Sequence, residues 1–253
     1  MRFYISSQSA GIGRGMRRAV AVVGAVTLLA SAGDAQGAVG LTAGTAAPVV
    51  NGADQANLAD DAVIPGGTFN QQAFSDNAGP PGQTFTTPAG VPLSLNGISL
   101  KGANTGGGNS GGDVFTAGTT WGLRVSSVAG TTLTPIQTFS GVPTVTGALG
   151  NEWFTFGFTG ADVLTLQGNS QYAFEVFSSA GYLGFDAAVD PASYAAGFAF
   201  NSTGAARQFG STTAQDRGYD RTFHVDLTAV PEPGSAAVLA TGAAVLLLRR
   251  RRR

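Results

Sequence analysis

The sequence predicts an all-β fold, a single β-sandwich or jelly-roll-like domain over residues 69–229, and composition and patterning both lead to it. With 38 Gly, 11 Pro and only 11% charged residues among 253, the chain favours pleated strands and turns over helices. From Gln83 onward, short runs of alternating apolar and polar residues recur between clusters of Gly, Asn, Pro and Ser, as is typical of sandwiches. Because the chain has no cysteine, apolar burial and hydrogen bonds must stabilise this domain.

Four alternating segments are expected to supply the core of the sandwich. Alternation places successive side chains on opposite faces of a strand, so every second residue faces inward. Arg124 is then expected to face water, and Glu175 to lie opposite a core face. His224 is expected on the solvent face or in a hydrogen bond with Asp226 or Asp220. The residues expected to face inward are Trp121, Leu123, Val125, Phe154, Phe156, Phe158, Tyr172, Phe174, Val176, Phe223, Val225 and Leu227.

Turn-forming residues divide this pattern. The run Gln167–Ser170 is predicted to form a hairpin loop. The shift in alternation at Asn96-Gly97 predicts a tight turn or a β-bulge. Asp190–Ala196 offers a helix start of about one turn, with Asp190 as N-cap. Residues 33–68 show little periodicity and are interpreted as a lead-in segment with no more than one strand.

The near-neutral net charge conceals a strong partition along the chain. Nine of the fourteen basic residues lie at the two ends, whereas all fifteen acidic residues lie between Gly33 and Pro233. With only five basic residues in that segment, its formal net charge is −10. Nucleic acids are therefore excluded as partners, because phosphate binding needs a basic surface, and tight binding of other polyanions is disfavoured for the same reason.

The N-terminal residues 1–32 have the layout of a secretory signal peptide. Arg17 and Arg18 precede the apolar run AVAVVGAVTLLA, and Ala30 and Ala32 form a small-x-small cleavage site. We expect signal peptidase to cut after Ala32 during export by the general secretory route. Arg17 and Arg18 also fit the export route for folded proteins, but the further pattern of that route is missing. The apolar run is too short for a spanning helix, which needs about 20 residues. Translation from Met1 or from Met16 is compatible with this layout.

Residues 230–253 form a second processing segment. Pro231, Glu232 and Pro233 precede an apolar or small stretch, 235–248, and the chain then ends in Arg249, Arg250, Arg251, Arg252 and Arg253. Fourteen helical residues span about 21 Å, less than the ~30 Å hydrocarbon core of a membrane. The arginines stop insertion and stay on the cytoplasmic side. This short membrane helix suits a segment presented to a membrane protease better than a lasting anchor.

The order of these three parts resembles the PEP-CTERM sorting signal of Gram-negative bacteria that make exopolysaccharide. The resemblance implies recognition of Pro231, Glu232 and Pro233, and removal of the signal by an exosortase-type membrane protease, with Arg249–Arg253 as the stop. It further implies a transient inner-membrane stage before the cell surface or extracellular matrix. The sandwich segments also look like ectodomains that precede such signals, which implies no activity and no binding residues.

Two catalytic arrangements are open to the sequence, and neither is preferred. Gly108–Gly112 fits G-x-S-x-G, with His224 downstream, but it lies in a Gly-rich run and not between a strand and a helix. Glu152 and Glu175 lie on neighbouring predicted strands and could serve as the carboxylate pair of a glycosidase. Both are equally well explained as solvent-facing strand residues. The sequence therefore predicts a protein that is not an enzyme.

Binding residues are also only candidates. The aspartates in predicted loops would suit calcium as a ligand. Capping of turns and solubility of the protein explain these aspartates better. Neither a calcium site nor any other cofactor is assigned. Trp153 and Phe177 lie opposite the core faces and could stack on sugar rings, or be core themselves under a further layer. The loop aspartates are Asp60, Asp61, Asp113, Asp186, Asp190, Asp216 and Asp220.

Two functional hypotheses follow. The first is a non-enzymatic surface or biofilm-matrix protein associated with exopolysaccharide. The second is a secreted carbohydrate-active enzyme that carries the same sorting signal.

Overall fold

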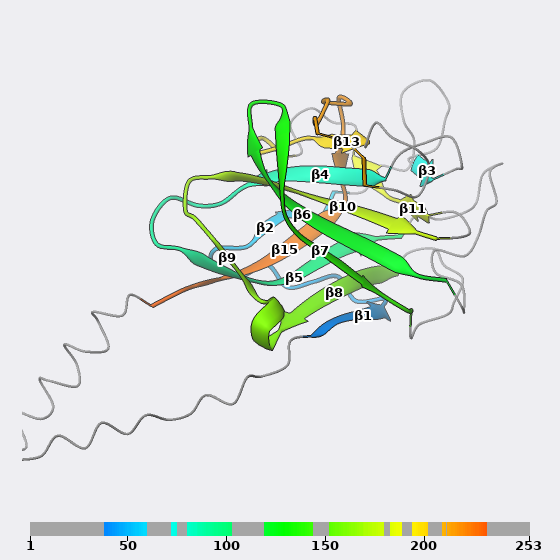
Figure 1. Cartoon of the computed structure of the whole chain (residues 1–253), viewed down its shortest axis with the longest axis horizontal. Coiled ribbons are helices and arrows are strands. Elements are labelled where there is room, and N and C mark those ends of the chain that lie inside the picture. The colour runs from blue at the N-terminus through cyan, green and yellow to red at the C-terminus, as the bar shows by residue number, and fades with distance from the viewer. Residues whose placement is uncertain are drawn as a thin grey trace, which may run out of the picture. The chain divides into compact units, whose positions relative to one another are not determined.

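The protein is described by a computed structural model, and most of its described residues lie in β-strands (Figure 1). They comprise 38–59, 72–74, 80–102, 119–143, 152–179, 183–188, 194–201, 209–210 and 212–231. Within these ranges the only helical element is the 3₁₀ turn η1 (Gly160–Asp162), and every strand pairing is antiparallel. The all-β prediction is confirmed.

Two larger sheets form a β-sandwich-like arrangement. The first sheet has the order β1 (Ala38–Gly44), β8 (Trp153–Thr159), β5 (Leu93–Lys101), β15 (Phe223–Ala229), β2 (Gln55–Asn57), and β9 (Leu164–Leu166) also pairs with β5. The second sheet has the order β13 (Ala199–Asn201), β4 (Pro81–Thr86), β10 (Gln171–Ser178), β6 (Trp121–Ala129), β7 (Thr132–Gly141). Two short pairs complete the described strands: β11 (Leu183–Phe185) with β3 (Gln72–Phe74), and β12 (Ala187–Ala188) with β14 (Asp220–Arg221).

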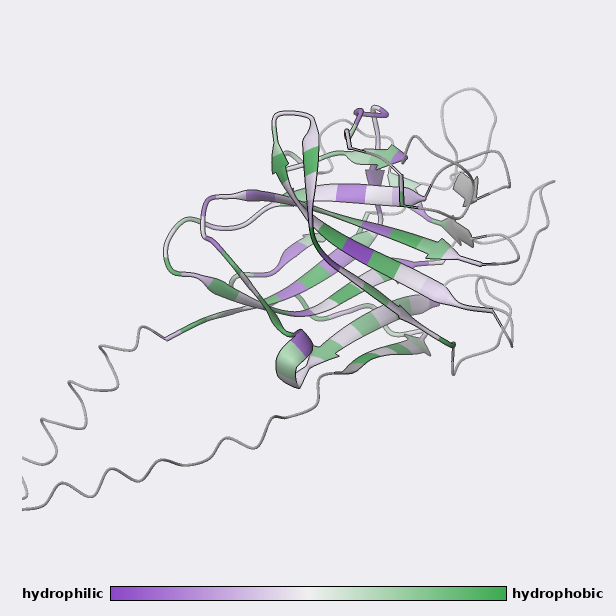
Figure 2. Cartoon of the chain, viewed as in Figure 1, coloured by the Kyte–Doolittle hydropathy of each residue, from purple (hydrophilic) through white to green (hydrophobic). Residues whose placement is uncertain are grey.

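Aromatic side chains join the two large sheets. The rings of Trp121 and Phe156 lie 5.2 Å apart between centroids, and those of Phe174 and Phe223 lie 5.8 Å apart. Each pair takes one ring from each sheet, and all four residues are at most 2% exposed. Burial of each large side chain contributes roughly 1.5–3 kcal/mol to stability. Figure 2 shows hydrophobic and hydrophilic bands alternating along these strands. The predicted inward faces are confirmed.

Two irregular positions shape the first sheet and its connection to the second. The register between β5 and β15 shifts between Asp226 and Leu227, opposite Asn96, so the predicted irregularity is a β-bulge and not a turn. Gln167–Ser170 does form a turn, with Asn169 at φ 52. The predicted hairpin is wrong, however, because β9 pairs with β5 whereas β10 belongs to the second sheet. The turn therefore passes from one sheet to the other.

The ends of the described chain join the first sheet. The segment 33–68 supplies two strands, β1 and β2, where we expected no more than one. Residues 1–32 and 232–253, which carry the predicted processing signals, lie outside the described residues, as does Asp190 with the predicted helix start. No helix in the described part of the chain is long and apolar enough to cross a membrane.

Removing the Phe156 ring should show how much the core depends on it. We expect Phe156→Ala to lower the free energy of unfolding by about 3–5 kcal/mol, because the ring is fully buried and leaves a cavity. Ile136→Ala is the matched control, since Ile136 lies on β7 and is 43% exposed, and it should cost about 1 kcal/mol or less. Urea unfolding measures both. Equal losses would contradict this account of the core.

Candidate functional site

The outer face of the first sheet carries a row of hydrogen-bonding side chains that crosses the strands. Thr42 of β1, Thr155 of β8, Ser99 of β5 and His224 of β15 are cross-strand partners in register. They face outward because their neighbours along each strand belong to the core. The hydroxyls of Ser99 and Thr155 are hydrogen-bonded at 2.8 Å. We call Thr42, Thr155, Ser99 and His224 the polar row.

A row of glycines lies beside the polar row. Gly40, Gly157 and Gly97 are cross-strand partners, and Asp226 continues the row on β15. A Cβ atom added at Gly40 or Gly157 would meet no heavy atom within 4 Å. The floor of this face is therefore bare backbone on β1 and β8. Gly40 and Thr42 are exposed, Gly157 and Thr155 are half-buried, and Ser99 and His224 are buried. Access is thus greatest at the β1 side.

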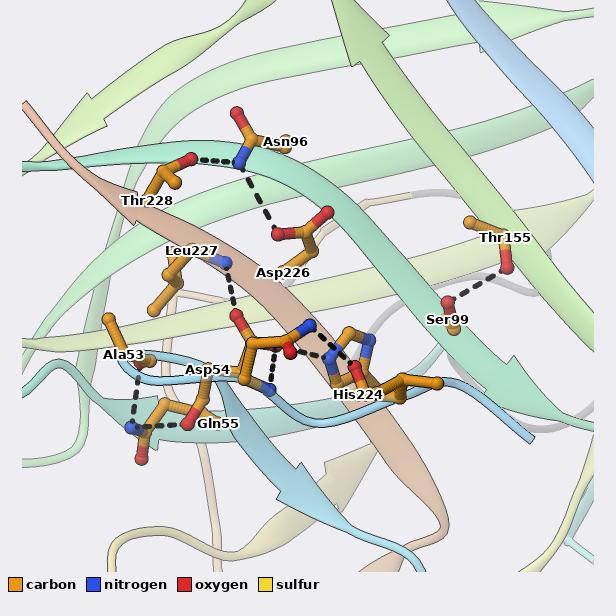
Figure 3. Close-up of polar contacts among 12 residues, drawn as sticks. Ala53, Asp54, Gln55, Asn96, Ser99, Thr155, His224, Asp226, Leu227 and Thr228 are labelled. Atoms are coloured by element: carbon orange, nitrogen blue, oxygen red, sulfur yellow. Dashed lines mark hydrogen bonds and ion pairs between the residues drawn. The ribbon is translucent and has the colours of Figure 1, made fainter.

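Asp54 closes the β15 side of the face (Figure 3). Its Oδ2 accepts a hydrogen bond from the backbone N–H of Asn51 at 2.8 Å and lies 3.0 Å from His224 Nε2. Its Oδ1 accepts from the N–H of Leu227 at 2.8 Å. Burial alone would raise the pKa of the Asp54 carboxyl, but these two backbone bonds and His224 together bring that pKa below its ordinary value. Asp54 therefore joins the segment before β2 to the last strand.

The bulge at Asn96 brings a second polar group to this face. Asn96 Nδ2 donates to Asp226 Oδ1 at 3.3 Å and also to the Thr228 hydroxyl (Figure 3). The extra residue of a bulge redirects its side chain away from the regular alternation. Asn96 thus bridges two successive outward residues of β15, and the end of that strand is tied to β5 by side chains as well as by its backbone.

His224 differs from its predicted environment. It is 6% exposed and contacts Asp54, so the predicted solvent-facing position and the predicted bonds to Asp226 or Asp220 are wrong. The cause is the turn that ends in Asp54, which lies 170 positions earlier in the chain and lies against the outer face of β15. Since Ser99 bonds to Thr155 and His224 to Asp54, the face offers hydrogen bonds and shows no nucleophile bonded to a base.

The predicted carboxylate pair is not brought together. Glu175 lies on β10 of the second sheet, whereas Glu152 directly precedes β8 of the first, so the prediction of neighbouring strands is wrong. Glu175 is fully buried, and its Oε2 lies 2.7 Å from Arg124 Nε and 2.5 Å from Arg124 Nη2. A buried carboxylate in an ion pair of this geometry serves structure.

Arg124 is buried, contrary to the prediction that it faces water. It is 5% exposed, and its guanidinium carbon lies 5.2 Å from the centre of the Phe209 ring. The Phe209 ring lies on the outer face of the second sheet. A second apolar cluster on that face includes Phe200, from the edge strand β13, and Ala214. When a strand is covered on both faces, the residues that point away from the core are buried as well.

The two aromatic candidates for sugar stacking are not free surface residues. Trp153 is only 5% exposed, so it is buried, in agreement with the alternative interpretation. Phe177 is half-buried and its ring lies 4.8 Å from that of Phe209, in an edge-to-face contact. A Cβ at Gly122 would come within 1.9 Å of the Phe177 ring, so Phe177 lies directly on the backbone of β6.

The described loop aspartates are engaged within the protein. Asp186 pairs with Lys101 at 3.5 Å, Asp220 accepts from Gln83 at 3.0 Å, and Asp216 accepts from the N–H of Gly218 at 2.7 Å. Within the described ranges, no three His, Asp or Glu side chains gather as metal ligands would. Four further aspartates and the G-x-S-x-G run lie outside those ranges: Asp60, Asp61, Asp113, Asp190 and Gly108–Gly112.

Fold and site together define the class of protein as antiparallel β-sandwich-like, with a hydrogen-bonding face on its first sheet. No protein-family model, no curated protein and no solved structure matches the chain. Sequence reasoning missed this face because its rows exist only across strands. The one local signal was glycine inside strands, as at Gly157 in FTFGF, which often marks a site of close approach.

The Asp54 contacts predict a pH-dependent contribution to stability. A carboxyl whose pKa is lowered by folding stabilises the fold above its unfolded pKa of about 3.9, and this stabilisation is lost as pH falls through the lower folded value. We expect Asp54→Asn to lower the free energy of unfolding by about 1–3 kcal/mol at neutral pH. The difference in free energy of unfolding between the variant and the wild type should shrink below about pH 4. Urea unfolding from pH 7 to pH 3 measures it.

The control for this prediction is Asp216→Asn, which removes the charge of an exposed aspartate. It should change the free energy of unfolding by about 0.5 kcal/mol or less. A difference between Asp54→Asn and the wild type that stays constant with pH would show that the Asp54 charge does not stabilise the fold.

Proposed function

We propose that the chain is an exported, non-enzymatic protein of the cell surface or biofilm matrix, sorted through a PEP-CTERM-like signal and associated with exopolysaccharide. The observation that carries the proposal is the order of the C-terminal segment, in which Pro231, Glu232 and Pro233 precede the apolar stretch 235–248 and Arg249–Arg253. The described strands are compatible with it. The first described strand begins at Ala38, after the expected signal-peptidase cut at Ala32, and the last ends at Ala229, before Pro231. Removal of both signals would therefore leave every described strand within the product.

The route follows from the two terminal segments. Signal peptidase removes residues 1–32, and the 235–248 helix holds the chain transiently in the inner membrane with Arg249–Arg253 inside. An exosortase-type protease then recognises Pro231, Glu232 and Pro233. The domain outside the membrane carries the acidic residues, in keeping with retention of positive charge on the cytoplasmic side.

The non-enzymatic part of the proposal is supported by the candidates for catalysis. Glu175 is committed to a buried ion pair with Arg124, and His224 is tied to Asp54. Glu152 and Glu175 lie in different sheets. These contacts favour a binding or structural role over a carbohydrate-active enzyme, which is the alternative function.

Association with polysaccharide is supported by the polar row and the glycine row. Hydroxyl, amide and carboxylate groups beside an open backbone floor match the donors and acceptors of sugar hydroxyls. The net charge of −10 between Gly33 and Pro233 favours a neutral polysaccharide over an acidic one.

Sorting is tested by intact mass of the protein from membrane and extracellular fractions of the native host. We expect an extracellular species that begins near Gly33 and ends near Pro233. Simultaneous replacement of Pro231, Glu232 and Pro233 by alanine should leave a membrane-bound species that ends in Arg253. Asp216→Asn is the control and should be sorted normally. A wild-type chain that retains Arg253 in the membrane would contradict sorting by cleavage.

Polysaccharide binding is tested by sedimentation with the neutral fraction of the host's exopolysaccharide. Gly157→Val should reduce binding about tenfold, because its side chain fills open space on the floor without displacing protein atoms. Ser140→Val places the same side chain at an exposed position on β7 of the second sheet, away from this face, and should bind like the wild type. Binding that Gly157→Val leaves unchanged would exclude this face, and turnover of the polysaccharide would favour the enzyme.

A further inference from the structure

The end of β15 is paired up to the residue that precedes the sorting motif. Ala229 is the partner of Leu93 on β5, and one residue later the N–H of Val230 donates to the carbonyl of Pro92 at 2.9 Å. Pro231 is exposed and cannot continue such a ladder, because proline has no N–H. Backbone pairing within the described residues therefore ends at Val230, although Thr228 and Ala229 are already exposed.

Side chains hold the same stretch of β15 in place. The Leu227 side chain is 3% exposed within the core, and the Leu227 N–H is bonded to Asp54. Asn96 bonds to the Thr228 hydroxyl across the bulge. β2 pairs with β15 only over Phe223–Val225, so the last residues of β15 are paired with β5 alone. Withdrawing these residues would break their pairing with β5 and the bond between Leu227 and Asp54.

Peptide recognition by strand addition requires an extended segment whose backbone groups are free to pair. Residues that are already paired in a sheet become available only when that part of the structure opens locally. We propose that the folded sandwich shields the peptide bonds up to and including Val230–Pro231, so that processing of the sorting signal cuts C-terminal to Pro231. That a cut occurs rests on the proposed function. The inference adds which peptide bonds the fold leaves accessible to the protease.

The cut itself is a hydrolysis. Water adds its hydroxyl to the carbonyl carbon of the scissile bond, the C–N bond breaks, and the new amine takes the remaining proton. The released domain keeps β15, Val230 and Pro231, and its first sheet is unchanged by the reaction.

Two measurements test the shielding. In the native host, intact mass of the released domain should give a C-terminus at or beyond Pro231; a C-terminus at Val230 or earlier would overturn the proposal. In detergent, the full chain should be treated briefly with a protease of broad specificity and its fragments weighed. We expect early cuts C-terminal to Pro231, with cuts within Leu227–Val230 at least about tenfold slower.

Variants separate shielding from sequence preference. Leu227→Ala removes the buried anchor and should speed cuts within 227–230 at least about tenfold. Asn96→Ala, which removes only the bond to the side chains of β15, should act in the same direction if Leu227→Ala fails to fold. Ile136→Ala on β7 is the control and should leave these cuts slow. Fast wild-type cutting within 227–230 would overturn the proposal.

The same design separates this inference from the proposed function. A host chain that is never cut would contradict sorting by cleavage, and the detergent experiment would then still decide whether the sandwich shields Leu227–Val230.

Discussion

The contact between aromatic rings across the two large sheets is the constraint on which the rest of the structure depends. In a chain without cysteine, the pairs Trp121–Phe156 and Phe174–Phe223 join strands that are far apart in sequence. Once these rings face inward, alternation determines which residues of each strand face outward. The polar row, the glycine row and the buried ion pair are all consequences of that choice of inner face.

The two outer faces then differ in how their residues are enclosed. On the second sheet, the rings of Phe200 and Phe209 lie on the outer face, and Arg124 and Glu175 are buried there. On the first sheet, Trp153, Ser99 and His224 are buried, but Gly40 and Thr42 are exposed. Burying a charge is costly unless it is paired, and removing one partner of such a pair is strongly destabilising. Charges on that sheet are therefore committed to structure. The first sheet instead has exposed backbone at Gly40, which leaves its face the better candidate for a ligand.

Alternation in the sequence was sufficient to predict the core faces and the irregularity at Asn96, because both are properties of single strands. Alternation was not sufficient to predict that Arg124, Trp153 and His224 are buried. A period of two distinguishes the faces of a strand but does not reveal whether a later segment covers the outer face. His224 is buried by a turn containing Asp54, and no local pattern links two residues 170 positions apart. The crossing between sheets at 167–170 escaped prediction for the same reason, since strand partners are chosen by tertiary packing.

The order of strands also bears on the proposed export of the chain. The first sheet takes β1 and β2 from the beginning of the described chain and β15 from its end, and β15 lies between β5 and β2. Non-local pairing of this kind cannot form until both partners are present. If the chain is exported from its N-terminus as proposed, the sheet can be complete only after Ala229 has left the channel. The proposed sorting motif would then be presented by a domain that has only just become able to fold.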